Sequence, residues 1–239
     1  MEFTKALIKG KLVKRYKRFF IDIKLDKETV TAHCPNTGSM KGLLDEGNEV
    51  FISKNDNPKR KLKYTLEIIK VNKKLVGVNT HFANKIAHHG LTNNLIKEVS
   101  NNDNIKPEVF FDKETRFDFL VEKNEQKIFV EVKSVTLSRK PPIAEFPDSV
   151  TSRGAKHLIE LAKMAKSGFR AVMLFLVCRN DCNSYKIADD LDPFYAECFL
   201  KAVEAGVEVL CYDTIITNKN VQIGRALPAY TGLINRKNV

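Results

Sequence analysis

Three residues in the second half of the chain have the types and spacing that metal-dependent phosphoester hydrolysis requires. If residues 128–137, IFVEVKSVTL, form a strand, its period of two places Glu131 and Lys133 on one face. The preceding expected strand, 116–121, carries Asp118. A symmetric hairpin turning at Asn124-Glu125 pairs residues whose numbers sum to 249, and this register places Asp118 opposite Glu131.

Carboxylates placed opposite each other repel unless a cation lies between them, and hard oxygen ligands favour Mg²⁺ or Mn²⁺. Asp118 and Glu131 are therefore candidate metal ligands. Lys133 is the candidate that orients a water molecule or stabilises the charged transition state. The alternative is an exposed strand face, on which Glu131 and Lys133 form an ion pair worth less than about 1 kcal/mol.

The elements predicted around these residues alternate between strands and helices from residue 84 onward. We expect helical segments within 83–99, broken near Gly90, and a first short strand at 108–111. A helix is expected from about 149 to 167 and an apolar strand at 171–178. Asp192-Pro193 marks the start of another helix, which stops at Gly206 before a last strand. This order predicts a mixed sheet flanked by helices over 84–239.

Residues 1–83 differ, because they contain five or six short alternating strands separated by turns. The pattern predicts a small β-barrel. An OB-like nucleic-acid-binding domain is the favoured fold, and a generic barrel is the alternative. The overall class is therefore α/β (α+β). The loop 33–40, HCPNTGSM, either presents backbone N–H groups to phosphate or connects a strand to a short helix at 41–44.

Basic residues are concentrated in the first half of the chain. Residues 1–106 hold 21 Lys and Arg against 11 Asp and Glu, whereas the remainder holds 19 against 18. A net charge of +10 in one half suits a polyanion, although ordinary lysine-rich solvated faces would also produce it. The candidate DNA contacts are Lys14, Arg15, Lys17, Arg18 and Asn36 in the barrel, and Arg153 and Lys156 at the start of a helix. His157, beside them, has either a structural or a catalytic role.

Cysteine usage and hydropathy indicate a reducing compartment. Five cysteines are an odd number, and three lie in apolar or helical stretches, which favours reduced thiols. Cys178 and Cys182 lack a second ligand pair at a spacing usual for zinc. No signal peptide or membrane-spanning stretch is found, so we expect a cytoplasmic protein without a membrane partner.

Five motifs, in order along nearly the whole chain, give it a close resemblance to the sugar fermentation stimulation protein A family. They are HCPNTG (33–38), RFDFL (116–120), EVK (131–133), FPDSVTSRG (146–154) and KHLIEL (156–161). The resemblance implies an N-terminal OB-like domain and a C-terminal domain of the PD-(D/E)XK nuclease superfamily. It also implies DNA binding and an association with the regulation of sugar (maltose) metabolism.

Carried over residue by residue, the superfamily pattern makes Asp118 its first acid, Glu131 its second acid and Lys133 its lysine. The main-chain carbonyl of Val132 would be a further metal ligand. Where relatives often carry a helical glutamate, this chain has His88-His89, and Glu98 is the remaining candidate acid. A second metal is therefore in doubt.

Two functions follow for the whole chain. The first is a DNA-binding nuclease that uses Mg²⁺ or Mn²⁺, with RNA as an alternative substrate. The second is a non-catalytic DNA-binding regulator that retains a nuclease fold. A homodimer is compatible with either.

Overall fold

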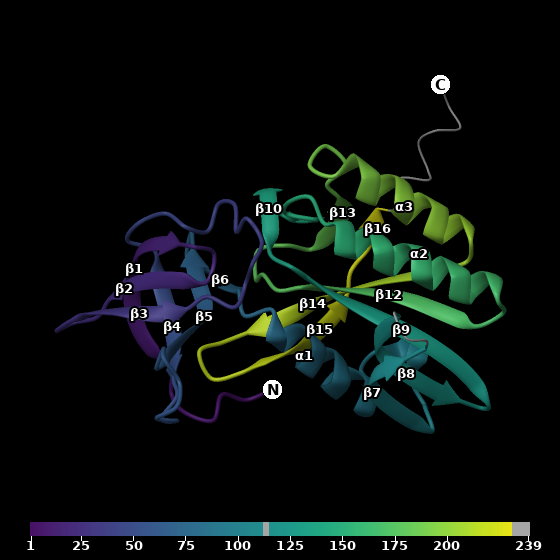
Figure 1. Ribbon diagram of the computed structural model, residues 1–239, viewed down its shortest axis with the longest axis horizontal. Helices are drawn as coiled ribbons and strands as arrows, with labels where there is room; N and C mark the ends of the chain where they lie inside the picture. Colours follow the sequence, from purple (N-terminus) through teal and green to yellow (C-terminus); the bar gives the residue numbers. More distant parts are fainter. Residues whose placement is uncertain (112–114, 231–239) are drawn as a thin grey trace.

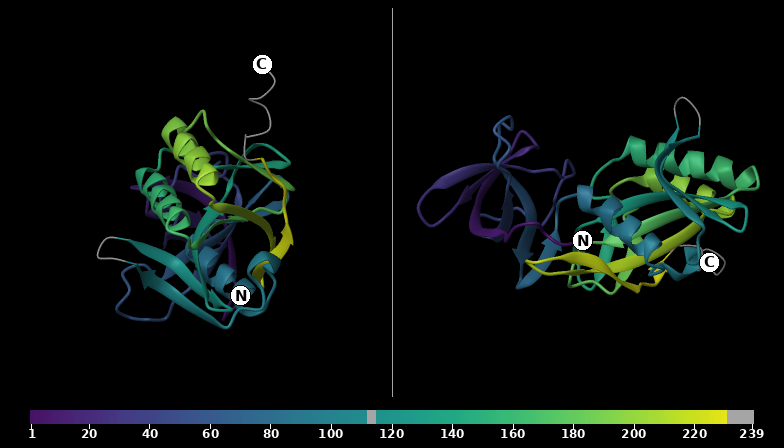
Figure 2. Two further views of the ribbon diagram at one scale, coloured as in Figure 1. Left: turned by 90° about the vertical axis from the view of Figure 1, so that its right-hand side faces the viewer. Right: turned by 90° about the horizontal axis from the view of Figure 1, so that it is seen from below.

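The computed structural model describes residues 1–111 and 115–230, which form a barrel and a larger sheet domain side by side (Figures 1 and 2). The strands of the barrel are β1 (Ile8–Tyr16), β2 (Phe20–Lys24), β3 (Thr29–His33), β4 (Glu49–Lys54), β5 (Tyr64–Val71) and β6 (Lys74–Gly77). Their order is β3-β2-β1-β4-β5-β6, and the pairing of β3 with β5 closes the barrel. Alternate residues such as Ile21 and Ile23 fill its core. The predicted OB-like barrel is confirmed.

Residues 41–43, after the third strand of the barrel, form a turn and no helix. Gly42, with φ +75°, and Met40, with φ +51°, both lie in the left-handed region. Such a conformation ends a helical turn as soon as it starts. The short helix considered for 41–44 is therefore absent.

Over its described residues, the larger domain has three helices and a central six-stranded mixed sheet. The helices are α1 (His81–Thr92), α2 (Ser152–Lys166) and α3 (Pro193–Glu204), with a 3₁₀ turn η1 (Lys97–Val99). The sheet comprises β7 (Asn104–Phe110), β8 (Arg116–Lys123), β9 (Gln126–Val135), β12 (Arg170–Val177), β14 (Glu208–Ile216) and β15 (Val221–Ala226). A smaller sheet contains β10 (Leu137–Lys140), β11 (Ile143–Phe146), β13 (Ser184–Ile187) and β16 (Ala229–Tyr230).

The order of the large sheet is β15-β14-β12-β9-β8-β7, with parallel strands in the centre and antiparallel strands at both edges. Helices α2 and α3 cover one face and α1 covers the other (Figure 1). Each face has its own apolar core, so β12 is buried on both sides, as its uninterrupted apolar sequence predicts. The predicted mixed α/β architecture is confirmed.

The local signals place the helix ends. At the start of α3, the side chain of Asp192 accepts a hydrogen bond from the N–H of Tyr195, and Pro193 is the first helical residue. Gly168 follows α2 with a φ of +85°, and Gly206 follows α3 with a φ of +97°. Helix α2 begins at Ser152, three residues later than expected. The break expected near Gly90 is absent, since helix α1 runs through this residue. Glycine at this position allows Ile223 to pack closely, because a Cβ there would lie only 3.0 Å from its Cδ1.

The barrel is joined to the larger domain by main-chain hydrogen bonds. The N–H of Gly77 donates to the carbonyl of Cys178 at 3.0 Å, and the N–H of Asn180 donates to the carbonyl of Leu75 at 3.1 Å. The first residues of the chain also lie on the larger domain, where the amino group of Met1 donates to the carbonyl of Val221. Within the described ranges, no helix has the length and apolar character needed to cross a membrane.

Candidate active site

The β8–β9 hairpin has the predicted register over most of its length. Pairs from Lys123–Gln126 to Phe119–Val130 have numbers that sum to 249. Asn124 and Glu125 both have positive φ, at 47° and 65°, as a two-residue hairpin turn requires. The turn therefore sets the register of the strand that carries the candidate chemistry.

Strand β8 becomes irregular at Asp118. Phe117 packs in the core under α2 and α3, whereas Phe119 packs in the core under α1. Two residues that are two positions apart would share a face in a regular strand, so the strand is distorted between them. The predicted Asp118–Glu131 ladder pair does not form; instead, Asp118 Oδ2 accepts the N–H of Val132 at 2.8 Å.

Asp118 also accepts a hydrogen bond from helix α1, which covers the face of the sheet opposite α2 and α3. Nδ2 of Asn84, in α1, donates to Asp118 Oδ1 at 2.7 Å. Burial, together with the negative charge of Glu131, raises the pKa of Asp118 above its usual value. Glu131 is thus close enough to oppose the ionisation of Asp118, although no hydrogen bond joins the two carboxylates.

Glu131 is 2% exposed and faces α2. Its Oε1 contacts Nδ1 of His157 and lies 2.6 Å from Nζ of Lys133. Burial opposes its ionisation, but the hydrogen bond from His157 and the charge of Lys133 outweigh burial and lower the pKa of Glu131. Within residues 1–111 and 115–230, its other oxygen, Oε2, is buried and has no hydrogen-bond partner.

His157 connects the helix to this carboxylate. A carboxylate only accepts hydrogen bonds, so Nδ1 of His157 carries the proton and donates it to Glu131. Nε2 then serves as an acceptor, 3.4 Å from Nε of Arg153. The arrangement resembles the outer hydrogen bonds that orient a ligating residue in metal sites.

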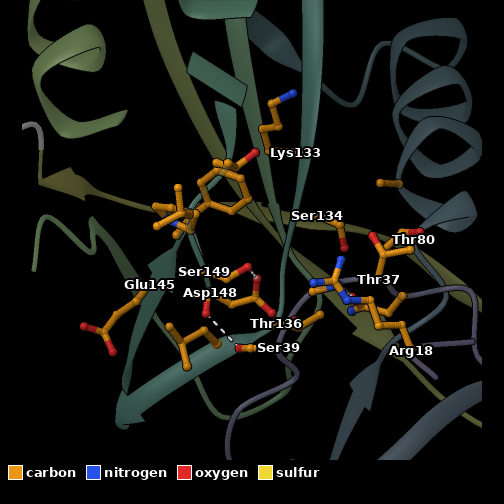
Figure 3. A pocket seen from close by; sticks show the side chains of 18 of the residues that line it. Arg18, Thr37, Ser39, Thr80, Lys133, Ser134, Thr136, Glu145, Asp148 and Ser149 are labelled. Carbon is orange, nitrogen blue, oxygen red and sulfur yellow. Dashed lines mark hydrogen bonds between the residues drawn. The ribbon is translucent and has the colours of Figure 1, made fainter. Parts of the chain in front are cut away.

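A polar cleft of about 780 Å³ opens between the barrel and the larger domain, and Lys133 and Val132 reach into it. Arg18, Thr37 and Thr80 line one side of the cleft. Figure 3 shows Lys133 at one end and the contact between Ser39 and Asp148 at the other. The cleft is therefore built by both domains.

A contact that we call the clasp, formed by Gly38, Ser39, Met40 and Asp148, joins the two sides of this cleft. Ser39 Oγ donates to the carbonyl of Asp148 at 2.7 Å, and the N–H of Met40 donates to its Oδ2 at 3.0 Å. A Cβ at Gly38 would lie 2.5 Å from the same oxygen. Only glycine at position 38 therefore allows the loop to approach Asp148 this closely.

The predicted DNA-contact residues in the barrel have three different environments. Arg15 donates to the carbonyls of Asn36 and Gly38, and Asn36 is 5% exposed, so both residues shape the loop at the clasp. Arg18 lines the cleft in the β1–β2 turn, where Lys17 also has positive φ. Lys14 lies over the ring of Tyr16.

The predicted contacts on the helix, Arg153 and Lys156, lie in the first turns of α2, with His157 beside them. Glu98, the remaining candidate for a helical acid, accepts a hydrogen bond from the hydroxyl of Tyr212. The residue that α1 supplies to the acids is Asn84. Neither Asn84 nor Asp148 was predicted from the sequence. Thr80 and Asn84 lie one helical turn apart, and both line the cleft.

Comparison with known proteins identifies the family. The family model described as "Sugar fermentation stimulation protein RE domain" matches residues 81–220. A second model, described as "SfsA N-terminal OB domain", matches residues 13–78. A sugar fermentation stimulation protein homolog of Pelagibacter ubique is 68% identical over 227 residues, covering 95% of this chain and 98% of the relative. One from Maricaulis maris is 47% identical over 229 residues, covering 95% and 97%.

A solved structure, that of SfsA from Pyrococcus furiosus in complex with Ca²⁺, is similar over both domains. It has a TM-score of 0.87 and 26% sequence identity, and the match covers 96% of this chain and 97% of the other. The two family models match in sequence order, and the most similar relatives that we compared align over nearly the whole chain. The chain belongs to the sugar fermentation stimulation protein family.

Proposed function

We propose that the protein binds nucleic acid, with DNA as the main substrate, and hydrolyses a phosphodiester bond with the help of Mg²⁺ or Mn²⁺. The observation that carries the proposal is the unpartnered Oε2 of Glu131, buried in a site that Asp118 and Lys133 share. A buried oxygen without a partner is costly and is typical of a position for an ion or a bound water. The Ca²⁺ complex of the solved relative supports a divalent-cation site in this chain as well.

The residues present fit such a cation. Among the described residues, no three His, Cys, Asp or Glu side chains form a metal-binding group. Asp118 and Glu131 would therefore be joined by the main-chain carbonyl of Val132, by water and by a substrate phosphate. Mg²⁺ characteristically binds through one or two carboxylates and keeps several waters. When bound, the cation would supply charge neutralisation and an activated water.

The chain's own residues would do the rest. Asn84 and the N–H of Val132 fix the Asp118 carboxylate, and His157 fixes that of Glu131. Lys133 Nζ, which reaches the cleft, would stabilise the negative charge that develops on the phosphate during the reaction. The basic barrel and Arg18 would hold the flanking strand electrostatically.

An incubation of the purified full chain with labelled DNA and RNA tests the proposal. Single strands and duplexes are compared with Mg²⁺, Mn²⁺ or chelator. We expect products only with the metals, and none from an Asp118→Ala, Glu131→Ala double variant. Equal cleavage by the double variant would mean that another nuclease contaminates the preparation.

A non-catalytic DNA-binding regulator of sugar metabolism is the second candidate. The observation in its favour is the ion pair between Lys133 and Glu131. A lysine with a purely structural role would make the same contact. Binding without cleavage under every metal and substrate would favour this candidate. For either function we propose a cytoplasmic location, which the five buried free cysteines support.

A further inference from the structure

A second groove, smaller than the interdomain cleft, shares His157 with the candidate active site. It has a volume of about 330 Å³ and lies between the β7–β8 edge of the sheet and the start of α2. Its main lining residues are Phe110, Arg116, Phe117, Arg153, Lys156 and His157. Because His157 also contacts Glu131, the groove lies next to that carboxylate of the candidate active site.

Phe110 is the unusual member of this groove. It is 65% exposed at the end of the edge strand β7, and in the part of the chain that the structure describes no aromatic ring packs against it. The next residue, Phe111, packs edge-on against Phe129 and Phe169, with 5.7 and 6.3 Å between the ring centroids. Phe111 therefore contributes to the packing of the domain. The ring of Phe110 makes no such contribution.

Arg116 gives this exposed ring a cationic neighbour. Its guanidinium lies 5.7 Å from the centroid of the Phe110 ring. The same guanidinium forms an ion pair with the Glu108 carboxylate, at 3.0 Å. An aromatic face beside fixed cations is the combination with which proteins bind unpaired nucleotides.

The charge of the groove is also suited to a phosphodiester chain. Of the residues that the structure describes, Arg116, Arg153 and Lys156 line the groove together with one carboxylate, Glu160, which Lys163 contacts at 2.8 Å. The groove has a volume at the lower end of the range for small-ligand pockets, which suits a single nucleotide better than a length of duplex. In a duplex, moreover, both faces of each base are already stacked on neighbouring bases.

We infer that this groove binds an unpaired nucleotide that flanks the scissile phosphodiester, with its base stacked on Phe110 and its phosphate beside Arg153. The inference rests on the proposed function and specifies its substrate class: a single strand, or a strand end freed from a duplex. Phe110 is then a binding residue for the substrate, and the chemistry remains with Asp118, Glu131 and Lys133.

Binding of labelled oligonucleotides to the full chain, measured in chelator so that no cleavage occurs, tests the inference. Phe110→Ala should weaken single-strand binding by about 5-fold to 100-fold, the usual effect of removing one stacking ring. Binding of a blunt duplex should change less than about 2-fold, since phosphate contacts elsewhere dominate it. Phe110→Trp should retain or strengthen single-strand binding.

Phe194→Ala is the matched control, because Phe194 is 58% exposed at the start of α3 and lies outside the groove. It should leave both affinities unchanged. Thermal unfolding of Phe110→Ala should match that of the parent, because so little of the ring is buried.

Three outcomes would overturn the inference, and they differ in what they leave standing. If Phe110→Ala binds single strands as the parent does, the groove has no such role and the proposed function survives. If the substitution changes the oligomeric state in sedimentation, Phe110 belongs to an interface between copies of this chain. If the parent binds no nucleic acid at all, the inference and the proposed function fail together.

Discussion

The two carboxylates of the site accept hydrogen bonds from different parts of the domain. Asp118 is bound to the main chain of Val132 and to Asn84 of α1, whereas Glu131 is bound to His157 of α2 and to Lys133. A cation between them would connect the layers on opposite faces of the sheet. Substitutions of the two acids should therefore alter metal binding similarly and local packing differently.

Replacement of Lys133 by Ala should separate chemistry from binding. A positioned charge that acts on the transition state contributes about 10²–10³ in rate, whereas one phosphate contact among many contributes little to affinity. We therefore expect single-turnover cleavage to fall by that factor and DNA affinity to change less than about 2-fold. Lys201→Ala, which removes an exposed ion pair with Glu197 on α3, is the control and should leave both unchanged. Cleavage at the parental rate would remove Lys133 from the mechanism.

Asp118→Asn should change the response of stability to metal in a distinctive way. The buried Asp118 carboxylate lies in the field of Glu131, so neutralising it removes a repulsion from the metal-free protein. An amide has only one acceptor oxygen, however, so its NH2 group would face one of the two donors, the N–H of Val132 or Nδ2 of Asn84. These two effects oppose each other, so in chelator the variant should unfold close to the temperature of the parent. Adding Mn²⁺ should raise the unfolding temperature of the parent and leave that of the variant nearly unchanged. A metal-induced shift of equal size in both proteins would exclude Asp118 as a ligand.

At the scale of elements, the sequence predicts what short-range rules control. The Asn124–Glu125 turn fixes the β8–β9 register, and Asp192 with Pro193 fixes the start of α3. The distortion at Asp118 could not be predicted, because it depends on the packing of Phe117 and Phe119 into two different cores. The contact of Asn84 with Asp118 likewise depends on where α1 docks, and the two residues are 34 positions apart.

The β10–β11 hairpin beside the cleft depends on one buried carboxylate. Glu145 is 3% exposed and accepts hydrogen bonds from the Arg139 side chain at 2.7 and 2.9 Å, with Lys186 at 3.3 Å. The side-chain hydrogen bonds from Arg139 lower the pKa of Glu145 to about 2. Glu145→Gln should therefore cost about 1–3 kcal/mol of unfolding free energy at pH 7.

The pH dependence of this effect follows from the direction of the shift. The unfolded chain binds more protons than the folded chain between the ordinary pKa of 4.5 and the folded value of about 2. The stabilisation by Glu145 is thus complete above pH 4.5 and is lost as the pH falls towards 2. Denaturant titrations of parent and variant should converge over that window. Glu197→Gln, in an exposed pair with Lys201, should cost less than about 0.5 kcal/mol throughout.

At the scale of the whole molecule, the clasp joins the barrel to the larger domain across the cleft. Arg15 stiffens the barrel side by holding the carbonyls of Asn36 and Gly38, and Asp148 receives the loop on the other side. Residues 38 and 148 are 110 positions apart, so no local pattern could have predicted their contact. Gly38 is the last residue of one motif that indicates the family, 33–38, and Asp148 lies in another, 146–154.

A double-mutant cycle at the clasp tests whether this close approach sets the domain arrangement. Gly38→Ala places a Cβ 2.5 Å from Asp148 Oδ2 and should force the loop away, at about 1–3 kcal/mol of unfolding free energy. Asp148→Ala removes both the clashing atoms and the bond to the N–H of Met40. In that background the Gly38→Ala substitution should therefore cost little, and the two effects should be strongly non-additive. Hydrogen exchange at the Met40 amide should be faster in each single variant than in the parent. Additive costs would show that position 38 is constrained by its own backbone and that the clasp does not hold the domains.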